Sequence, residues 1–188
     1  MKRKALLLCM ILLGAPMSGW ADERHDADID VSVLVEDENV SVDVHLPVAA
    51  SRELVWAVLT DFAHMSSFVT NLRESKVMSS QGNTLVIQQG GTAQYGPLKF
   101  PFDSTREIRL TPWDSIESRQ ISGNMHKMLG LTRLSEKDGV TLVDYHADSV
   151  PGHWIPPLVG KAFIAHELRE QFQQLRDEML RRKQRLNN

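Results

Sequence analysis

One long amphipathic segment near the C-terminus constrains the fold of this chain more than any other feature. Between residues 157 and 185, apolar side chains recur every three or four positions, which is the spacing of one face of an α-helix. The members of this stripe are Leu158, Ala162, Ala165, Leu168, Phe172, Leu175 and Met179. A helix of this kind gains most of its stability from packing, so the rest of the chain must supply an apolar surface for it.

The region that precedes this helix has the pattern of antiparallel strands. Apolar and polar residues alternate, and short segments rich in Gly, Pro, Asn or Asp interrupt the alternation as turns. The predicted strands cover residues 72–79, 84–94, 98–110, 115–122, 126–136 and 140–149. Gly90 and Gly91 lie inside one of these strands, which predicts a bulge or a sharp bend where the sheet curls.

A hairpin and a short helix are predicted before these strands. Alternating valines at 31–35 and at 40–46 flank a polar turn, which predicts a β-hairpin whose second strand ends at Pro47. Ser51 is then expected to cap a helix whose apolar face extends to Phe62. The segment that follows, up to residue 68, is expected to form a second short helix or an ordered loop.

This order of elements predicts an α+β fold. A meander of antiparallel strands and one major apolar helix have a simple packing solution, in which the curved sheet becomes a half-barrel that grips the C-terminal helix. An apolar helix face against a concave sheet leaves room for a cavity. The chain shows no internal repeat and no linker after residue 21, so residues 22–188 are expected to form one domain.

The N-terminus has the pattern of a secretory signal peptide. Lys2, Arg3 and Lys4 precede an apolar run at 5–13, and small residues lead up to Ala21. The run is too short to cross a bilayer core, which needs about 20 apolar residues. We therefore expect cleavage of residues 1–21 near Ala21 and a periplasmic or secreted protein, with an uncleaved anchor as the alternative.

Composition excludes several classes of function. The chain has 21 basic and 24 acidic residues and no basic stripe, so nucleic acid is not an expected partner. Its single cysteine excludes an intramolecular disulfide or a CxxC site. The seven histidines form no HxH or HxxxH pair, so no metal is expected. Motifs such as GxSxG, HExxH and the glycine-rich phosphate loop are missing from the sequence, and neither a cofactor nor a catalytic residue is assigned.

Three segments carry a resemblance to a known superfamily. They are LPVAASRELVWAVLTDF at 46–62, FVTNLRESKV at 68–77 and PPLVG at 156–160. They resemble START-like, Bet v 1-like helix-grip proteins (the SRPBCC superfamily), and most of all the polyketide cyclase/dehydrase and lipid-transport group with its coenzyme Q-binding START proteins. The resemblance covers a core at 40–183, and the hairpin at 29–38 is an addition to it. It implies a deep, mainly apolar pocket between the sheet and the helix.

The residues expected to line this pocket or its mouth are aromatic, sulfur-containing or isolated polar side chains. They are Phe68, Tyr95, Phe100, Phe102, Arg106, Met125, Met128, Trp154, Phe163 and His166. Aromatic loops around residues 95–102 and 154–157 are interpreted either as lids or membrane wedges, or as ordinary caps of the sheet end. The methionines either adapt to an apolar ligand or fill the core.

Some polar positions have two interpretations. Arg106 alternates with an inward row of apolar residues, where a buried charge needs a partner or a ligand, or else it faces solvent beyond a twist. His166 either orients a ligand's polar head or is satisfied by backbone at the helix–sheet boundary. Asp144 and His146 share one strand face, opposite to that of Tyr145, and are either paired with each other or solvated.

The sequence thus predicts an exported binding protein that holds a hydrophobic small molecule, such as a lipid, an isoprenoid quinone or a polyketide-like compound, for transport or sequestration. A transient contact with a membrane is part of this expectation. Two alternatives stay open. One is a cyclase- or dehydratase-type enzyme in which Arg106, Tyr145 or His166 polarises a carbonyl, and the other is a periplasmic interaction module without a ligand.

Overall fold

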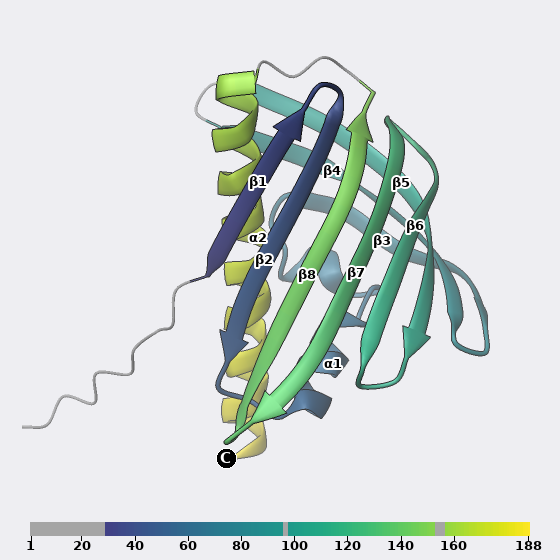
Figure 1. Ribbon diagram of the computed structural model, residues 1–188. Coiled ribbons are helices and arrows are strands. Elements are labelled where there is room, and N and C mark those ends of the chain that lie inside the picture. Colours follow the sequence, from purple (N-terminus) through teal and green to yellow (C-terminus); the bar gives the residue numbers. More distant parts are fainter. Residues whose placement is uncertain (1–28, 96–97, 153–156) are drawn as a thin grey trace, which may run out of the picture.

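Eight strands with alternating burial form one strongly curved antiparallel sheet, and a long helix lies across its open side (Figure 1). The computed structural model describes residues 29–95, 98–152 and 157–188, with only the backbone for Tyr95, Leu98 and residues 157–159. The predicted signal peptide at 1–21 and Trp154 lie outside the described residues. The α+β class and the helix-grip architecture, including the added N-terminal hairpin, are confirmed.

The strands and the C-terminal helix lie close to their predicted positions, with ends that differ by a residue or two. The helix predicted to extend to Phe62 ends at Leu59, and Phe62 lies in the turn that follows. The strands are β1 (Asp30–Glu36), β2 (Asn39–Val48), β3 (Leu72–Gln81), β4 (Thr84–Tyr95), β5 (Leu98–Thr111), β6 (Ser115–Gly123), β7 (Met125–Lys137) and β8 (Val140–Pro151). The helices are α1 (Arg52–Leu59), the 3-10 helix η1 (Met65–Ser67) and α2 (Pro157–Leu186).

The strand order β1-β2-β8-β7-β6-β5-β4-β3 explains how the sheet closes around the helix. After β2 the chain crosses through α1 and η1 to the far edge of the sheet, and it then returns strand by strand until β8 pairs with β2. Figure 1 shows the sheet curving from β1 and β2 around to β3 and β4. Helix α2 contacts β1 and β2 on one side and β4 on the other, so it bridges the open side of the half-barrel.

The most deeply buried side chains gather around the C-terminal half of α2. Phe172, Leu175 and Met179 are the buried apolar residues of this helix, and they belong to one core with α1, β2 and β8. Within residues 161–171 no side chain is fully buried, although Ile164 and Leu168 pack against the edge of the core. The helix is therefore tightly packed at its end and loosely packed in its first half.

A carboxylate and two arginines reinforce the packed end of α2. Glu178 is only 5% exposed and accepts hydrogen bonds from Arg181 and from Arg182, at 2.5 and 2.6 Å. Burial alone would raise the pKa of Glu178, but these two arginines lower it below its usual value. Arg182 also donates to Asp61, at 2.7 Å, in the segment that follows α1. These ion pairs connect the end of α2 to the loop beyond α1.

Two local expectations have different outcomes. The bend at the paired glycines is confirmed, because β3 has an extra residue, Arg73, opposite Gly90 and Gly91. A side chain at Gly91 would place its Cβ atom 1.9 Å from the carbonyl oxygen of Asn71. The prediction that Pro47 ends β2 is wrong, since the strand continues through Val48. Strand β1 begins at Asp30, opposite His45, so β2 has no partner on this side at Pro47 and tolerates a residue without an N–H group.

No helix in the described part of the chain is both long and apolar enough to cross a lipid bilayer.

The packing predicts a large difference between two leucines of the N-terminal hairpin. Leu46 is fully buried beneath α2, whereas Leu34 is 54% exposed. We expect Leu46→Ala to lower the free energy of unfolding by about 2–5 kcal/mol, through lost burial and a cavity. Leu34→Ala should change it by less than about 0.5 kcal/mol. Urea unfolding followed by circular dichroism measures both, and equal effects would contradict this description of the core.

Candidate functional site

The concave face of the sheet has a continuous group of polar side chains within an otherwise apolar surface. Residues directly opposite each other in neighbouring strands point to the same face, so the register identifies the inward positions. Arg106, for example, lies between Ile87 of β4 and Gln120 of β6. We call this group the polar belt: Ser75, Gln89, Ser104, Arg106, Ser118, Gln120 and Tyr145.

Gln89 is the member of the belt with the most hydrogen bonds. Its Nε2 donates to Ser75 Oγ at 2.9 Å and to Met65 Sδ at 3.3 Å, while Ser75 Oγ donates to the Phe62 carbonyl at 2.5 Å. Gln89 Oε1 accepts a hydrogen bond from Arg106 Nη2. Because both ends of the amide have partners, its oxygen is held toward the guanidinium. Arg106 is therefore positioned from the β4 side.

Arg106 points inward, which decides between the two orientations that the sequence left open. Burial lowers the pKa of its guanidinium, and the neighbouring Tyr145 has the opposite effect. Burial likewise raises the pKa of the Tyr145 phenol above its usual value, with Arg106 opposing it. Arginine keeps its proton in proteins and the phenol stays neutral near pH 7. The concave face thus presents both a cation and a neutral hydroxyl donor.

Four polar atoms of the belt are buried and have no hydrogen-bond partner within the described part of the chain. They are Ser104 Oγ, Arg106 Nε, Ser118 Oγ and Gln120 Oε1. The other end of the Gln120 amide is occupied, because Nε2 donates to the Met125 carbonyl at 2.8 Å. A buried polar group without a partner costs about 1–3 kcal/mol, so folded proteins rarely keep several together without a reason. Such a cluster is typical of a surface that a bound molecule completes.

The sheet is also irregular beside this cluster. Strand β6 pairs with β7 only from Ser115–Arg133 to Arg119–Leu129. Beyond this point β6 follows β5 and β7 follows β8, and each strand contains an extra residue, Ile121 in β6 and His126 in β7. Gln120 bridges the two strands where they separate, through its bond to Met125. Two of the predicted pocket residues, Met125 and Met128, are half-buried at this separation.

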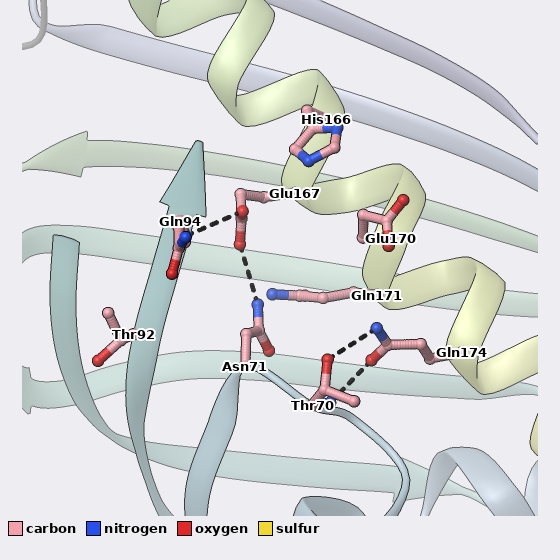
Figure 2. Close-up of a pocket in the computed structure, with 9 residues that line it drawn as sticks. All are labelled: Thr70, Asn71, Thr92, Gln94, His166, Glu167, Glu170, Gln171 and Gln174. Carbon is pink, nitrogen blue, oxygen red and sulfur yellow. Dashed lines mark hydrogen bonds between the residues drawn. The ribbon is translucent and has the colours of Figure 1, made fainter. Parts of the chain in front are cut away.

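A polar hollow of about 260 Å³ lies where α2 meets the edge formed by β3 and β4. Figure 2 shows the side chains that line it. Glu167 accepts hydrogen bonds from Asn71 Nδ2 and from the Gln94 backbone, each at 3.1 Å. Gln174 accepts from the Thr70 backbone at 2.8 Å and donates to Thr70 Oγ1 at 2.9 Å. We call these four hydrogen bonds the seam, because they join the helix to the edge of the sheet. His166, half-buried, is part of the wall of this hollow.

A second hollow, of about 450 Å³, lies on the outer face of β5, β6 and β7. Charged side chains line most of it, and Glu107 forms ion pairs there with Arg109 and Arg119 at 3.2 and 3.3 Å. This composition suits a hydrophobic ligand poorly.

The predicted aromatic residues lie at different places. The rings of Phe100 and Phe163 are 4.8 Å apart and join the start of β5 to the start of α2, although Phe100 stays 45% exposed. Phe102 is half-buried on the concave face near Gly91. Phe68 is instead at the packed end of α2, with the Arg182 guanidinium 5.5 Å from its ring centre. Trp154 and the side chain of Tyr95 lie outside the described residues.

Asp144 and His146 lie on the outer face, in a row of cross-strand pairs. His45 Nδ1 is 2.5 Å from Asp144 Oδ1, and His146 Nδ1 is 2.8 Å from Asp43 Oδ1. The expected solvated position is confirmed, and neither residue pairs with the other, while Tyr145 between them packs its ring 5.4 Å from that of Phe172. In both histidines the hydrogen bond to the facing aspartate is the main cause that raises the pKa.

Sequence reasoning did not identify five members of the belt as site residues: Ser75, Gln89, Ser104, Ser118 and Gln120. A signal was present in two strands. Gln89 alternates with the buried Ile87, and Gln120 alternates with Ser118 and with the buried Ile116. A polar residue at the strand period of buried isoleucines indicates an inward polar position.

A family model described as polyketide cyclase / dehydrase and lipid transport matches residues 48–176. No curated protein matches the chain. Similar solved structures include the ZhuI aromatase/cyclase from Streptomyces sp. R1128, with 19% identity and a TM-score of 0.64 over 77% of this chain and 95% of that one. A STAR-related lipid transfer protein fragment from Xanthomonas axonopodis gives 13% identity and a TM-score of 0.69 over 81% and 94%. At these identities the structures support the fold alone.

A metal site finds no support in the part of the chain that the structure describes, where histidine, cysteine, aspartate and glutamate form no group able to hold an ion.

The outer His–Asp pairs predict a pH dependence of stability. Because the folded-state pKa of His45 and of His146 is raised, their contribution is fully present below the unfolded pKa of about 6.5 and is lost as the pH rises through the folded values. We expect the free energy of unfolding to fall more steeply from about pH 6 to about pH 8 in the natural chain than in the double variant His45→Gln/His146→Gln. The exposed His126→Gln is the control, and equal slopes in all three proteins would contradict the prediction.

The seam predicts a local loss of protection. Gln174→Ala removes both hydrogen bonds to Thr70, so the Thr70 amide should exchange with solvent faster and the free energy of unfolding should fall by about 1–3 kcal/mol. Glu170→Ala, an exposed residue of the same hollow, is the matched control. Hydrogen exchange measured by mass spectrometry or NMR tests this, and unchanged protection at Thr70 would show that the seam does not hold the helix.

Proposed function

Because the chain belongs to the polyketide cyclase / dehydrase and lipid transport family, we propose that it binds a hydrophobic small molecule between the concave face of the sheet and α2. In this proposal the cargo is a lipid, an isoprenoid quinone or a polyketide-like compound, and the protein transports or sequesters it. The observation that carries the proposal is the polar belt, whose four buried atoms without partners lie inside the half-barrel.

The surroundings of the belt can supply the apolar part of the binding energy. Phe102, Met128 and Leu168 are half-buried side chains of β5, β7 and α2, and the first half of the helix is not sealed against the sheet. Removing apolar surface from water contributes about 25 cal/mol per Å². A few polar groups then orient the ligand, which is the usual division of labour in small-molecule sites.

Export is part of the same proposal. The pattern at residues 1–21 is that of a secretory signal, and we propose that the mature protein acts in the periplasm or outside the cell. A hydrophobic compound in an aqueous compartment needs shielding from water, which the space between the curved sheet and α2 would provide. The exposed ring of Phe100, beside the start of α2, is a candidate for transient contact with a membrane during loading.

An enzymatic role is the second candidate, and the presence of both Arg106 and Tyr145 on the concave face favours it. A cation and a neutral phenol on the same concave face are suited to polarise a carbonyl oxygen. One of the similar folds is an aromatase/cyclase. Under this alternative the ligand leaves the protein chemically altered, so cyclised or dehydrated product released during incubation would favour catalysis over carriage.

The proposed function is tested by what the protein holds when it is isolated gently from its native host. We expect organic extraction and mass spectrometry to recover one hydrophobic compound in near-stoichiometric amount. An empty extract, repeated after incubation with native membranes, would contradict the proposal.

A variant with a larger side chain on the concave face tests whether the compound binds between the sheet and α2. A Cβ atom at Gly130 would lie 3.5 Å from Tyr145 Cε2 and 3.6 Å from Ser118 Cβ, in ordinary contact on the concave face. Gly130→Leu should therefore fold but lose the bound compound. Leu129→Phe, one residue away and exposed, is the matched control and should keep it. Equal recovery from both variants would place the ligand elsewhere.

A further inference from the structure

The charge of Arg106 is not neutralised by the protein. Its partners are neutral: Nη2 donates to the Gln89 amide, Nε has no partner, and Tyr145 is an uncharged phenol near pH 7. Among the described residues no carboxylate lies within 4.0 Å of this guanidinium. A lone buried charge is expensive, because the protein interior replaces only part of its hydration.

Arg182, which holds the packed end of α2, differs from Arg106 because its partners are carboxylates. Arg182 is more than a quarter exposed, yet it is paired with both Glu178 and Asp61, at 2.6 and 2.7 Å. Arg106 is more strongly desolvated and has amide, hydroxyl and phenol neighbours instead. Arg106 therefore lacks a counter-charge on the interior face where the ligand is proposed to bind.

We infer that the hydrophobic ligand carries a carboxylate and that Arg106 binds this head group. The inference rests on the proposed function and adds the chemical class of the cargo. Nη2 of the guanidinium donates to Gln89, whereas the Nε–H has no partner and is left to donate a charge-assisted hydrogen bond to a carboxylate. The hydroxyl of Ser104, two positions along the same strand face, can add a donor.

Two other head groups fit the belt less well. An alcohol would accept a hydrogen bond but would leave the positive charge of Arg106 uncompensated. A phosphate monoester carries nearly two negative charges near pH 7, so one guanidinium would leave an excess buried anion. Gln120 Oε1 has no hydrogen-bond partner and belongs to the residue opposite Arg106. It can accept a hydrogen bond from a guanidinium N–H of Arg106 that does not donate to the carboxylate. A head group with a single negative charge therefore compensates the positive charge of Arg106.

The test compares three probes that share one apolar chain: dodecanoate, dodecanol and dodecyl phosphate. Each displaces the neutral fluorescent probe N-phenyl-1-naphthylamine from the mature protein at pH 7. We expect dodecanoate to bind about tenfold or more tightly than the other two, because hydrogen bonds to charged groups are the strong ones. Arg106→Gln should remove this advantage and leave dodecanol nearly unchanged.

Arg109→Gln, on the same strand but on the outer face, is the matched control and should keep the preference. Equal affinities for dodecanoate and dodecanol, a preference for the phosphate, or an equal loss of both ligands in Arg106→Gln would overturn the inference. If the Arg106 variant does not fold, the ranking of the three probes by the natural protein decides. Failure of all three probes and of the fluorophore to bind would instead contradict the proposed function itself.

Discussion

The packing of the C-terminal half of α2 against β2, β8 and α1 is the interaction on which the rest of the structure depends. A single helix has to cover a curved sheet of eight strands, and only its last turns are fully packed. Met179 is completely buried there, and the ion pairs of Glu178 and Arg182 add polar anchors. Because this end is secure, the first half of the helix can remain loosely packed over the concave face without the fold being lost.

The concave face shows what that loose packing permits. Arg106, Gln120 and two serines keep polar atoms without partners, and β6 separates from β7 beside them. Each feature lowers stability on its own, since buried polar groups and broken ladders both cost free energy. These features are concentrated on one face, beside the buried Ile87 and Ile108, and this is the arrangement expected where stability is given up for binding.

The sequence predicts the strands and the helix well because both depend on local periodicity. Phe172, Leu175 and Met179 of the α2 stripe and the alternating residues of β2 and β8 are buried as their spacing predicts. Ala162, a predicted member of the same stripe, is exposed, because the first half of α2 is loosely packed. The interior of the site depends instead on register. Ile121 is an extra residue in β6 and is 53% exposed, so alternation counted along that strand loses its phase near Gln120. The inward orientation of Arg106 likewise could not be predicted from spacing, because it is shown by a hydrogen bond to Gln89, a residue of the neighbouring strand.

The central claim is that a hydrophobic molecule lies between α2 and the concave face. The most direct measurement is photochemical labelling of the folded protein with an alkyl diazirine probe, followed by peptide mapping by mass spectrometry. The account predicts cross-links at inward positions of β5, β7 and α2, such as Phe102, Met128 and Leu168. Cross-links confined to outward residues such as Trp113 and Leu129 would contradict it.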